Sequence, residues 1–351
     1  MKLLVSAMEH SSNLHLAALK KELGDDVELL GIFDEKLGNP AVDLSALAVM
    51  GFIDALKKLP FFFRLADRMV ELAADADKVL LMDGSGFNLP LAKKLKKRYP
   101  DKEIVYYILP QAWAWKRKRI PVLERTVDRL ASILPFEKEY YSPTAPIEYV
   151  GHPLLDEIPR FREEASPKTE RVVFMPGSRR GEIRRLMPLF RQVRESLDAE
   201  ALVVVPEHFS KEEINELYGT LSSFIVTHDA HAALYESDFA FICSGTATLE
   251  ASLIGTPFVL AYVAKPLDYL IARTLVKLDH IGLANIMFER FEGRPLHPEL
   301  IQNDVTSEAL LAKMHALDPE AFLADSKALR GYLGHGSSKR VAQLIKGDVQ
   351  T

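Results

Sequence analysis

Cysteine is almost absent from this sequence, with Cys243 alone among 351 residues. An intramolecular disulfide is therefore excluded, and a reducing compartment is expected. No run of 18 consecutive apolar residues occurs, so no segment is long enough to predict a membrane-spanning helix. Met1-Lys2 leads straight into the apolar run Leu3-Leu4-Val5, without the charged, apolar and cleavage regions of a secretory signal. Together these absences predict a cytoplasmic protein.

A strong excess of one charge is also missing. The 44 Lys and Arg residues nearly balance the 49 Asp and Glu residues, giving a formal net charge of −5. This balance argues against a general nucleic-acid binder. Basic residues nevertheless gather in the first half of the chain, at Lys93–Arg98 and Lys116–Arg119. Such clusters are usually solvated helix faces, but their place beside aromatic residues also indicates contact with an anionic surface.

Short apolar segments alternate with longer amphipathic ones along the chain, which is typical of βαβ units and parallel sheets. A chain of 351 residues also exceeds what a single hydrophobic core usually supports. The predicted strands are residues 3–6, 27–31, 79–82, 103–107, 129–134, 148–150, 171–175, 201–205, 223–226, 239–243 and 257–261.

The alternation breaks in a polar segment between Gly151-His152-Pro153 and Lys168. We therefore predict an α/β protein with two doubly wound, Rossmann-like domains facing a cleft, over residues 1–160 and 168–330. Residues 331–351 are predicted to form a C-terminal helix that packs on the first domain, with Ser337-Ser338 as candidate N-caps. Ligands of such sheets bind at the carboxyl ends of the strands.

Residues 171–182 are predicted to form a strand, a turn and the start of a helix. The apolar run stops at Pro176-Gly177-Ser178, and Arg179 precedes an amphipathic segment. Gly177 lets backbone N–H groups approach a ligand, and a helix N-terminus favours negative charge. The Arg179 guanidinium fits a diphosphate bidentately. The alternative is an ordinary strand-to-helix turn, where Gly and Ser are common.

A second loop of this kind, Ser244-Gly245-Thr246, follows the apolar run that ends at Cys243. Its small residues leave room for a ligand. Glu250 is expected in the first turn of the next helix, where its carboxylate can accept hydrogen bonds from a ribose. The two loops together predict a site for a nucleoside diphosphate.

Asp83 follows the predicted buried strand 79–82, so its carboxylate is expected at the ligand-binding edge of the sheet. It is a candidate general base for the attack of a sugar hydroxyl. An Asx-turn or a helix N-cap is the alternative role. Gly84 and Gly86 imitate the start of a dinucleotide fingerprint, but its third glycine is absent, which excludes an NAD site.

Glu9 and His10 follow the first predicted strand at the equivalent position. They are candidates to orient Asp83 or to bind an acceptor, while capping of the first helix is the alternative. His152 is a candidate for the cleft or a packed linker residue. His228 and His231 have the spacing of metal ligands, but only one carboxylate lies near them in sequence, so a metal is not expected.

Aromatic residues near the basic clusters have two interpretations. In a helix that begins at Pro60, Phe61 and Phe63 flank the core stripe of Phe62, Leu65, Met69 and Leu72. They are candidates for shallow insertion beneath anionic head groups, or else they widen the core face. Trp113 and Trp115 similarly belong either to the core or to a wall that faces acyl chains.

Several of these motifs resemble those of the lipid-A-disaccharide synthase family, which consists of glycosyltransferases with the two-domain GT-B architecture. The combination of AWAWKRKR with GSRRGE downstream is specific, and the matches follow the family's order along nearly the whole chain. The matching stretches are LAVMGFIDAL (47–56), QAWAWKRKR (111–119), LPFEKEYY (134–141), VGHPLLDE (150–157), MPGSRRGE (175–182), SGTATLEASLIGTP (244–257) and the segment 265–285.

The resemblance implies an inverting transfer from a UDP-activated diacylglucosamine to the 6-hydroxyl of a diacylglucosamine 1-phosphate. The products would be the β-1,6-linked lipid A disaccharide 1-phosphate and UDP, formed without a cofactor or a metal. Domain 1–160 would face the acceptor and the cytoplasmic surface of the inner membrane, and domain 168–330 would bind the donor. The resemblance leaves a homodimer open.

The resemblance also assigns roles to individual residues. The catalytic candidates are Asp83, Arg179 and Glu9. The donor-binding candidates are Gly177, Ser178, Arg179, Ser244, Gly245, Thr246, Thr248, Glu250 and Asn285. The candidates on the acceptor or lipid side are His10, Asn88, Phe61, Phe63, Trp113 and Trp115.

Two loops depart from the family pattern. The first loop reads GExSGD in the family and is Met8–Asn13 here. The glutamate is kept as Glu9, while both glycines and the aspartate are replaced. The family's DxPDFN is here Asp83–Asn88, with Gly86 in place of the second aspartate. Since Asp83 has lost this like-charged neighbour, we expect it to stay ionised to lower pH.

Two other functions remain open on the same fold. One is a sugar-nucleotide 2-epimerase, which acts on soluble nucleotides and needs no membrane-facing phenylalanines. The other is a non-catalytic lipid- or nucleotide-binding relative, which the two altered loops make conceivable.

Overall fold

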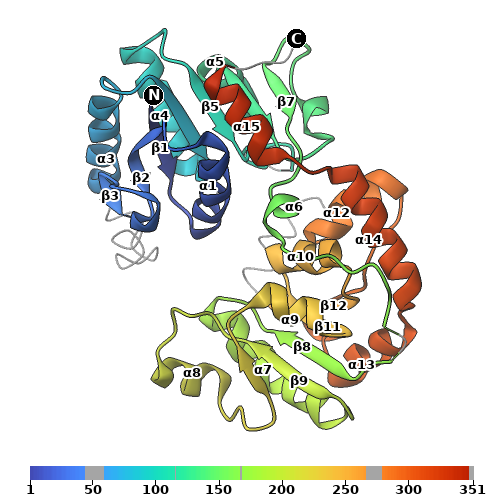
Figure 1. Ribbon diagram of the computed structural model, residues 1–351. Coiled ribbons are helices and arrows are strands. Elements are labelled where there is room, and N and C mark those ends of the chain that lie inside the picture. Colours follow the sequence, from blue (N-terminus) through green and yellow to red (C-terminus); the bar gives the residue numbers. More distant parts are fainter. Residues whose placement is uncertain (44–58, 115, 167, 266–278, 348–351) are drawn as a thin grey trace. The chain divides into compact units, whose positions relative to one another are not determined.

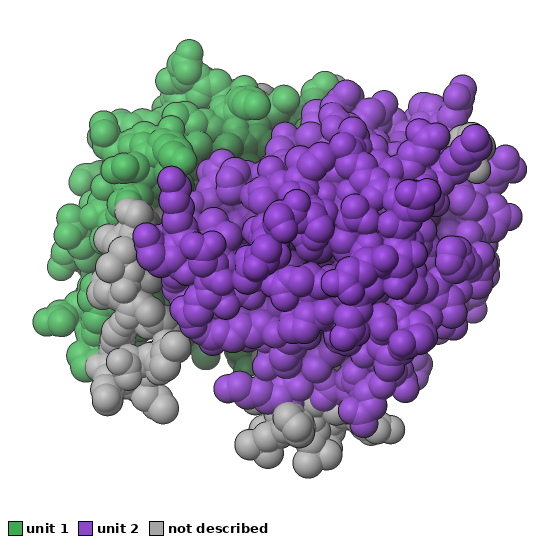
Figure 2. Space-filling model, turned by 90° about the horizontal axis from the view of Figure 1, so that it is seen from below, with its two compact units in different colours: residues 1–157, 333–351 green, residues 158–332 purple. Residues whose placement is uncertain are grey.

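The computed structural model describes residues 1–43, 59–114, 116–166, 168–265 and 279–347. The chain forms two compact units, coloured separately in Figure 2. Unit 1 consists of Met1–Glu157 together with Leu333–Thr351, and unit 2 consists of Ile158–Tyr332. Each unit has its own parallel sheet covered by helices (Figure 1).

Unit 1 contains a seven-stranded parallel sheet in the order β3-β2-β1-β4-β5-β6-β7. The central strands are apolar and buried on both faces, as expected where helices cover both sides of a parallel sheet. The strands are β1 (Lys2–Ala7), β2 (Glu28–Phe33), β3 (Val42–Asp43), β4 (Lys78–Met82), β5 (Ile104–Tyr107), β6 (Arg129–Ser132) and β7 (Ile147–Tyr149).

The helices of unit 1 include one from the C-terminal end of the chain. The described helices of the unit are α1 (His10–Leu23), η1 (Glu35–Leu37), α3 (Leu59–Leu72), α4 (Ser85–Arg98), η3 (Arg117–Arg119), α5 (Ile120–Thr126), η4 (Glu137–Tyr140), α6 (Leu154–Glu157) and α15 (Ser337–Lys346). Helix α15 packs on α1, with Val341 and Ile345 in one apolar cluster with Leu16 and Leu19. This confirms that the C-terminal helix returns to the first unit.

Unit 2 contains a six-stranded parallel sheet in the order β10-β9-β8-β11-β12-β13. Its strands are β8 (Arg171–Met175), β9 (Glu200–Val204), β10 (Ile225–Thr227), β11 (Phe239–Cys243), β12 (Phe258–Tyr262) and β13 (Glu299–Ile301). Its described helices are α7 (Arg180–Glu195), α8 (Lys211–Tyr218), α9 (Ala230–Glu236), α10 (Thr246–Ile254), α12 (Leu283–Glu292), η5 (Gln302–Asp304), α13 (Ser307–Ala316) and α14 (Pro319–Leu333).

The structure corrects three local predictions. Strands β3 and β13 have no counterpart among the predicted strands, because they have two and three residues at sheet edges and carry little apolar pattern. Ser337 and Ser338 do not cap α15. Its N-cap is Gly336, and the Asp156 carboxylate accepts hydrogen bonds from the N–H groups of Gly336 (2.7 Å) and Ser338 (3.0 Å).

The order of the strands brings the candidate loops together in pairs. In unit 1, β1 pairs with β4 so that Ala7 lies opposite Met82, and both strands end there. In unit 2, β8 pairs with β11, with Met175 opposite Ile242. Among the described helices, none has the length and apolar character needed to cross a membrane.

Candidate active site

Glu9 and Asp83 meet at the carboxyl end of the unit 1 sheet. Each lies in the loop after its strand, β1 or β4, and the pairing of these strands places the loops side by side. The two carboxyl groups share a hydrogen bond. Glu9 occupies the N-cap position of α1, but its side chain makes no capping hydrogen bond. Its carboxyl group contacts Asp83 instead.

Burial changes the expected protonation of Asp83. Withdrawal from water raises the pKa of Asp83, although the Gly84 N–H, the Glu9 hydrogen bond and the charge of His15 act in the opposite direction. Withdrawal from water and the nearby Asp83 charge raise the pKa of Glu9. The prediction that Asp83 stays ionised to lower pH is therefore wrong. Gly86 removes one like-charged neighbour, but the burial of the Asp83 carboxyl group raises its pKa by itself.

The backbone of Asp83 is held in an unusual conformation. Its φ of 46° lies in the left-handed region, which a non-glycine residue adopts only where its surroundings impose it. The Tyr106 hydroxyl donates a hydrogen bond to the Asp83 carbonyl oxygen. Burial raises the pKa of Tyr106 and keeps this group a neutral donor. The Tyr106 hydroxyl thus holds the backbone of the turn that carries Asp83.

Two asparagine side chains form hydrogen bonds to the backbone of these two loops. Asn88 is fully buried, and its amide donates hydrogen bonds of 3.0 Å to the carbonyl oxygens of Met82 and Asp83. Asn13 does the same for the first loop, donating to Ala7 (2.9 Å) and Glu9 (2.8 Å). Each asparagine lies six residues beyond the end of its strand. Asn88 thus acts on the site through the Asp83 loop, and the equivalent role of Asn13 was not foreseen.

A histidine that sequence reasoning missed lies near the carboxyl pair. The Nδ1 atom of His15 is 2.5 Å from the Glu157 carboxylate, and both side chains are only 13% exposed. When it is protonated, the His15 ring favours the ionised form of Asp83 and so lowers the pKa of Asp83. No local signal marks His15, because Glu157 is distant in sequence. His10 is exposed at the first position of α1.

In unit 2, the loop after β8 has the predicted form. Gly177 has a φ of 98°, and a Cβ atom there would lie 2.6 Å from a Glu182 oxygen and 3.3 Å from Cys243. A side chain at this position would be strained by the positive φ and crowded by Glu182 and Cys243. Ser178 is exposed, and Arg179 is the N-cap residue of α7. The Arg179 guanidinium is 81% exposed and contacts the Glu182 carboxylate at 3.0 Å, leaving most of its donors facing solvent.

The helix starts of unit 2 fall into two groups. Helices α8, α9 and α13 begin with side-chain caps from Ser210, Asp229 and Thr306. Helices α7, α10 and α12 begin without one, and before α12 the Glu299 carboxylate accepts from the N–H groups of Ile281 and Gly282. Helices α7 and α10 are the two that follow the predicted diphosphate loops, and neither N-cap side chain covers the first N–H groups. Their N-termini therefore present donors and partial positive charge to an anion.

The second loop is exposed at Gly245 and Thr246, while Ser244 is half-buried. The buried Thr248 hydroxyl donates to the Gly245 carbonyl oxygen at 2.8 Å, so this side chain shapes the loop. Glu250 is the fifth residue of α10 and lies beyond the first turn where it was expected. Its carboxylate is 17% exposed and 3.8 Å from the His231 ring.

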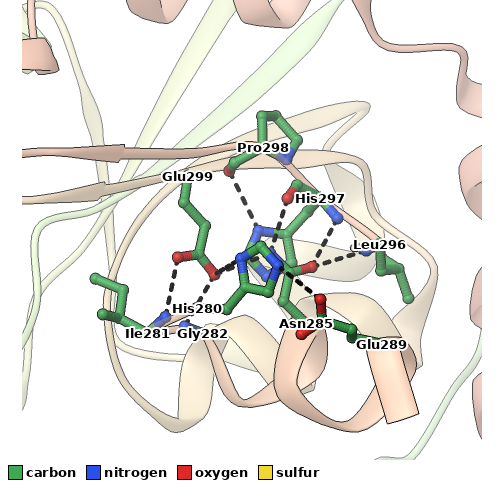
Figure 3. A network of polar contacts seen from close by, with 9 residues as sticks. All are labelled: His280, Ile281, Gly282, Asn285, Glu289, Leu296, His297, Pro298 and Glu299. Carbon is green, nitrogen blue, oxygen red and sulfur yellow. Dashed lines mark hydrogen bonds and ion pairs between the residues drawn. The ribbon is translucent and has the colours of Figure 1, made fainter. Parts of the chain in front are cut away.

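Asn285 is fully buried in a network of polar contacts (Figure 3). Its amide donates to the His297 carbonyl oxygen (2.9 Å) and the Glu299 carboxylate (2.8 Å), and its oxygen accepts from the N–H groups of Leu296 and His297. These bonds use its whole hydrogen-bonding capacity. Glu299 also accepts from the N–H of Gly282. Asn285 thereby anchors the start of α12.

The lipid-side candidates differ in exposure. Phe63 is 56% exposed, whereas Phe61 is half-buried, packs on the core of unit 1 and contacts Phe62 edge to face. Trp113 is buried, with its ring 5.0 Å from that of Phe136, so its surface is used in packing. Trp115 lies outside the described residues, as does the stretch 47–56.

The remaining histidine candidates have ordinary structural roles. His152 is buried, and its Nδ1 accepts a hydrogen bond from the Leu154 N–H. Burial lowers the pKa of His152 to about 3, so it stays neutral. His228 Nδ1 contacts the Val205 carbonyl oxygen at 2.6 Å. Within the described part of the chain, no cluster of three or more His, Cys, Asp or Glu residues is arranged to hold a metal ion.

The two parallel sheets and their loop pairs define a protein with a GT-B-like fold. The fold is shared over 99% of this chain with a putative UDP-N-acetylglucosamine 2-epimerase from Listeria monocytogenes, at a TM-score of 0.64, 16% identity and 96% coverage of that chain. It is also shared with MurG from Acinetobacter baumannii, at a TM-score of 0.57, 13% identity and 99% coverage of both chains.

Sequence similarity narrows this class to one family. The profile of the family described as lipid-A-disaccharide synthetase matches residues 3–327. Lipid-A-disaccharide synthase from Helicobacter pylori strain G27 is 48% identical over 353 residues, which cover 97% of this chain and 96% of the relative. The chain belongs to the lipid-A-disaccharide synthase family and is a glycosyltransferase of lipid A biosynthesis.

Proposed function

We propose that this protein joins a UDP-activated diacylglucosamine to the 6-hydroxyl of a diacylglucosamine 1-phosphate. The products are the β-1,6-linked lipid A disaccharide 1-phosphate and UDP. The observation that carries this proposal is the 48% identity to a lipid-A-disaccharide synthase across 97% of the chain. The carboxyl pair of unit 1 and the uncapped helix starts of unit 2 supply the chemistry that such a transfer needs.

Asp83 is the proposed general base. Its carboxylate takes the proton of the acceptor 6-hydroxyl as the oxygen attacks the anomeric carbon of the donor. Glu9, in its protonated form, donates a hydrogen bond to Asp83 and keeps that group the ionised member of the pair. The attack inverts the anomeric centre, and the bond to UDP breaks on the opposite side.

Arg179 and the N-termini of α7 and α10 are the proposed binding site for the diphosphate. The exposed guanidinium and the N–H groups of both helix starts stabilise the negative charge that develops on departing UDP. Gly177, Ser178, Ser244, Gly245 and Thr246 form the backbone around the phosphates. Glu250 accepts hydrogen bonds from the ribose. Thr248 and Asn285 support this site by holding the Gly245 loop and the start of α12.

The function is tested by incubating purified protein with both acylated substrates and analysing the products by mass spectrometry. Equal amounts of disaccharide 1-phosphate and UDP are expected. UDP release without disaccharide would contradict the transfer. No release at all would favour a non-catalytic relative.

Epimerase activity deserves a separate assay because a putative UDP-N-acetylglucosamine 2-epimerase shares the fold. UDP-N-acetylglucosamine is incubated alone with the protein, and its C2 epimer is measured by nuclear magnetic resonance. We expect none. Rapid formation of the epimer would replace the transferase proposal.

We also propose peripheral attachment to an anionic membrane through α3. Phe63 is exposed, and Arg64 and Arg68 of the same helix are exposed beside it. Burial of a phenylalanine contributes about 1.5–3 kcal/mol, so Phe63→Ser should weaken liposome binding even at low salt. Phe61→Ser is the control for a change in packing. If the Phe63 variant binds liposomes normally and high salt releases the protein completely, the attachment is purely electrostatic.

A further inference from the structure

A groove of about 680 Å³ lies on unit 1 between helix α4 and the segment formed by η3 and α5. This volume is within the range of about 300–1,000 Å³ that is common for small-molecule sites. The groove is separate from the Glu9–Asp83 contact and contains none of the residues assigned to the donor. Its lining residues are Leu89, Pro90, Lys93, Lys116, Arg117, Lys118, Arg119 and Val122.

The apolar part of this lining comes from Leu89 and Pro90 on α4 and from Val122 on α5. Leu89 is buried in the core of unit 1, and Val122 is half-buried against the same core. These side chains offer no hydrogen-bonding group. They form a surface that favours hydrocarbon over water.

The polar part of the lining is entirely cationic. Lys93 and the run Lys116–Arg119 line the groove, and no carboxylate does so. Lys93 and Lys118 are exposed, and within the described residues neither has a carboxylate partner. By contrast, Lys94 and Lys96 of the same helix form ion pairs with Asp67 and Asp128. The groove thus combines an apolar surface with two lysines, Lys93 and Lys118, that no carboxylate of the described residues neutralises.

A hydrogen bond joins this groove to the candidate active site. Arg119 lines the groove, and its guanidinium donates to the Ser85 hydroxyl at 2.7 Å. Ser85 is the first residue of α4 and lies two residues after Asp83. A ligand in the groove is therefore bound next to the loop that carries the proposed base.

We infer that this groove is the binding site for the acceptor, an acylated amino-sugar phosphate, with its phosphate held by Lys93 and Lys118 and an acyl chain on Leu89, Pro90 and Val122. The inference rests on the proposed function and specifies its acceptor site. A free sugar phosphate would leave the apolar surface in water, and an uncharged lipid would leave the lysines without an anion. Anionic membrane lipids share this chemistry, but the link through Arg119 and Ser85 to the Asp83 loop favours the acceptor.

The test uses the double variant Lys93→Gln/Lys118→Gln, assayed by UDP release in detergent micelles. Each cation near an anionic surface contributes about fivefold in affinity, so removing two of them should raise the acceptor KM roughly 25-fold. The donor KM and kcat should remain near wild type. With an acceptor that lacks the phosphate, the variant and the wild type should have the same KM.

The matched control is Lys21→Gln/Lys97→Gln, which removes the same charge from exposed positions outside the groove, one of them on α4. Its acceptor KM should equal that of the wild type. The apolar surface is tested by Val122→Phe, which should raise the KM for a long-chain acceptor more than for a short-chain one. Circular dichroism and thermal unfolding confirm that each variant is folded.

The outcomes separate this inference from the proposed function. If the wild type releases no UDP from the two substrates, the proposed function fails. If the wild type is active but the Lys93/Lys118 variant keeps the wild-type acceptor KM, the groove is not the acceptor site. Loss of binding to phosphatidylglycerol vesicles by that variant, with the acceptor KM unchanged in micelles, would assign the lysines to the membrane and overturn the inference.

Discussion

In unit 1, the loops after β1 and β4 bring two carboxyl groups into contact, whereas in unit 2 the loops after β8 and β11 bring together glycines, hydroxyls and an exposed guanidinium. Both pairs of loops follow neighbouring strands of a parallel sheet. The shared scaffold therefore fixes where the loops meet, and the side chains fix the chemistry. A raised carboxyl pKa suits proton transfer, while uncapped helix starts suit a diphosphate.

The largest expected effect concerns the base in unit 1. Asp83→Asn keeps the shape of the side chain but cannot accept the acceptor's proton. We expect kcat to fall by roughly 10²–10⁴-fold, the usual contribution of a general base. Glu9→Gln is the control, because its amide can still donate to Asp83, and its loss should be much smaller. If Asp83→Asn lowers kcat only slightly while Glu9→Gln is inactive, the general base lies in the first loop instead.

The next effect concerns the leaving group in unit 2. Arg179→Ala should lower turnover by roughly 10²–10³-fold, the scale of losing one charge-stabilising donor. Because the side chain is 81% exposed, the fold should be unaffected, as an unchanged Tm would verify. Arg180→Ala is the matched control, since the neighbouring guanidinium contacts Glu213. Equal losses in the two variants would deny Arg179 a specific role.

A smaller effect is expected in the pH dependence. The hydrogen bond from Glu9 and the charge of His15 both lower the pKa of Asp83, so removing either raises it. The acid limb of kcat/KM should therefore move to higher pH in Glu9→Ala and in His15→Gln. Glu9→Gln keeps the donated hydrogen bond and His10→Gln changes an exposed neighbour, so both should leave the limb in place. A shift to lower pH in His15→Gln would refute this account of the pair.

No effect is expected from chelation. Arg179 and the helix starts supply the positive charge that a divalent metal supplies in other transferases, and the sequence contains no Asp-x-Asp pair beside the diphosphate loops. Turnover should be the same in excess EDTA. Loss of turnover that Mg²⁺ or Mn²⁺ restores would show that unit 2 does not stabilise UDP alone.

Regular patterns made the fold predictable from the sequence. Long apolar strands alternate with amphipathic helices, so both sheets and the return of the C-terminal helix were expected. The edge strands β3 and β13 were missed because two or three residues carry no periodic signal. The local sequence indicates serines as the cap of α15, because Asp156, which provides the cap, is 180 residues away from Gly336 in sequence.

Contacts between distant segments limited the prediction of the site. Glu9 and Asp83 are predictable as site residues because each follows a buried strand. Their shared hydrogen bond depends on the register of β1 and β4, which the sequence does not reveal. His15 acts with Glu157, 142 residues away. Asn88, Thr248 and Asn285 belong to motifs that predict site residues. Their side chains are nevertheless buried and hydrogen-bonded to the backbone, which only the packed structure shows.

The separation of proton transfer from UDP binding is tested most directly by measuring the Kd of UDP by calorimetry. The proteins compared are the wild type, Asp83→Asn and Arg179→Ala. The account predicts an unchanged Kd for Asp83→Asn and, because a charged hydrogen bond contributes about 1.5–3 kcal/mol, a Kd at least tenfold weaker for Arg179→Ala. Weaker UDP binding by Asp83→Asn, together with normal binding by Arg179→Ala, would contradict it.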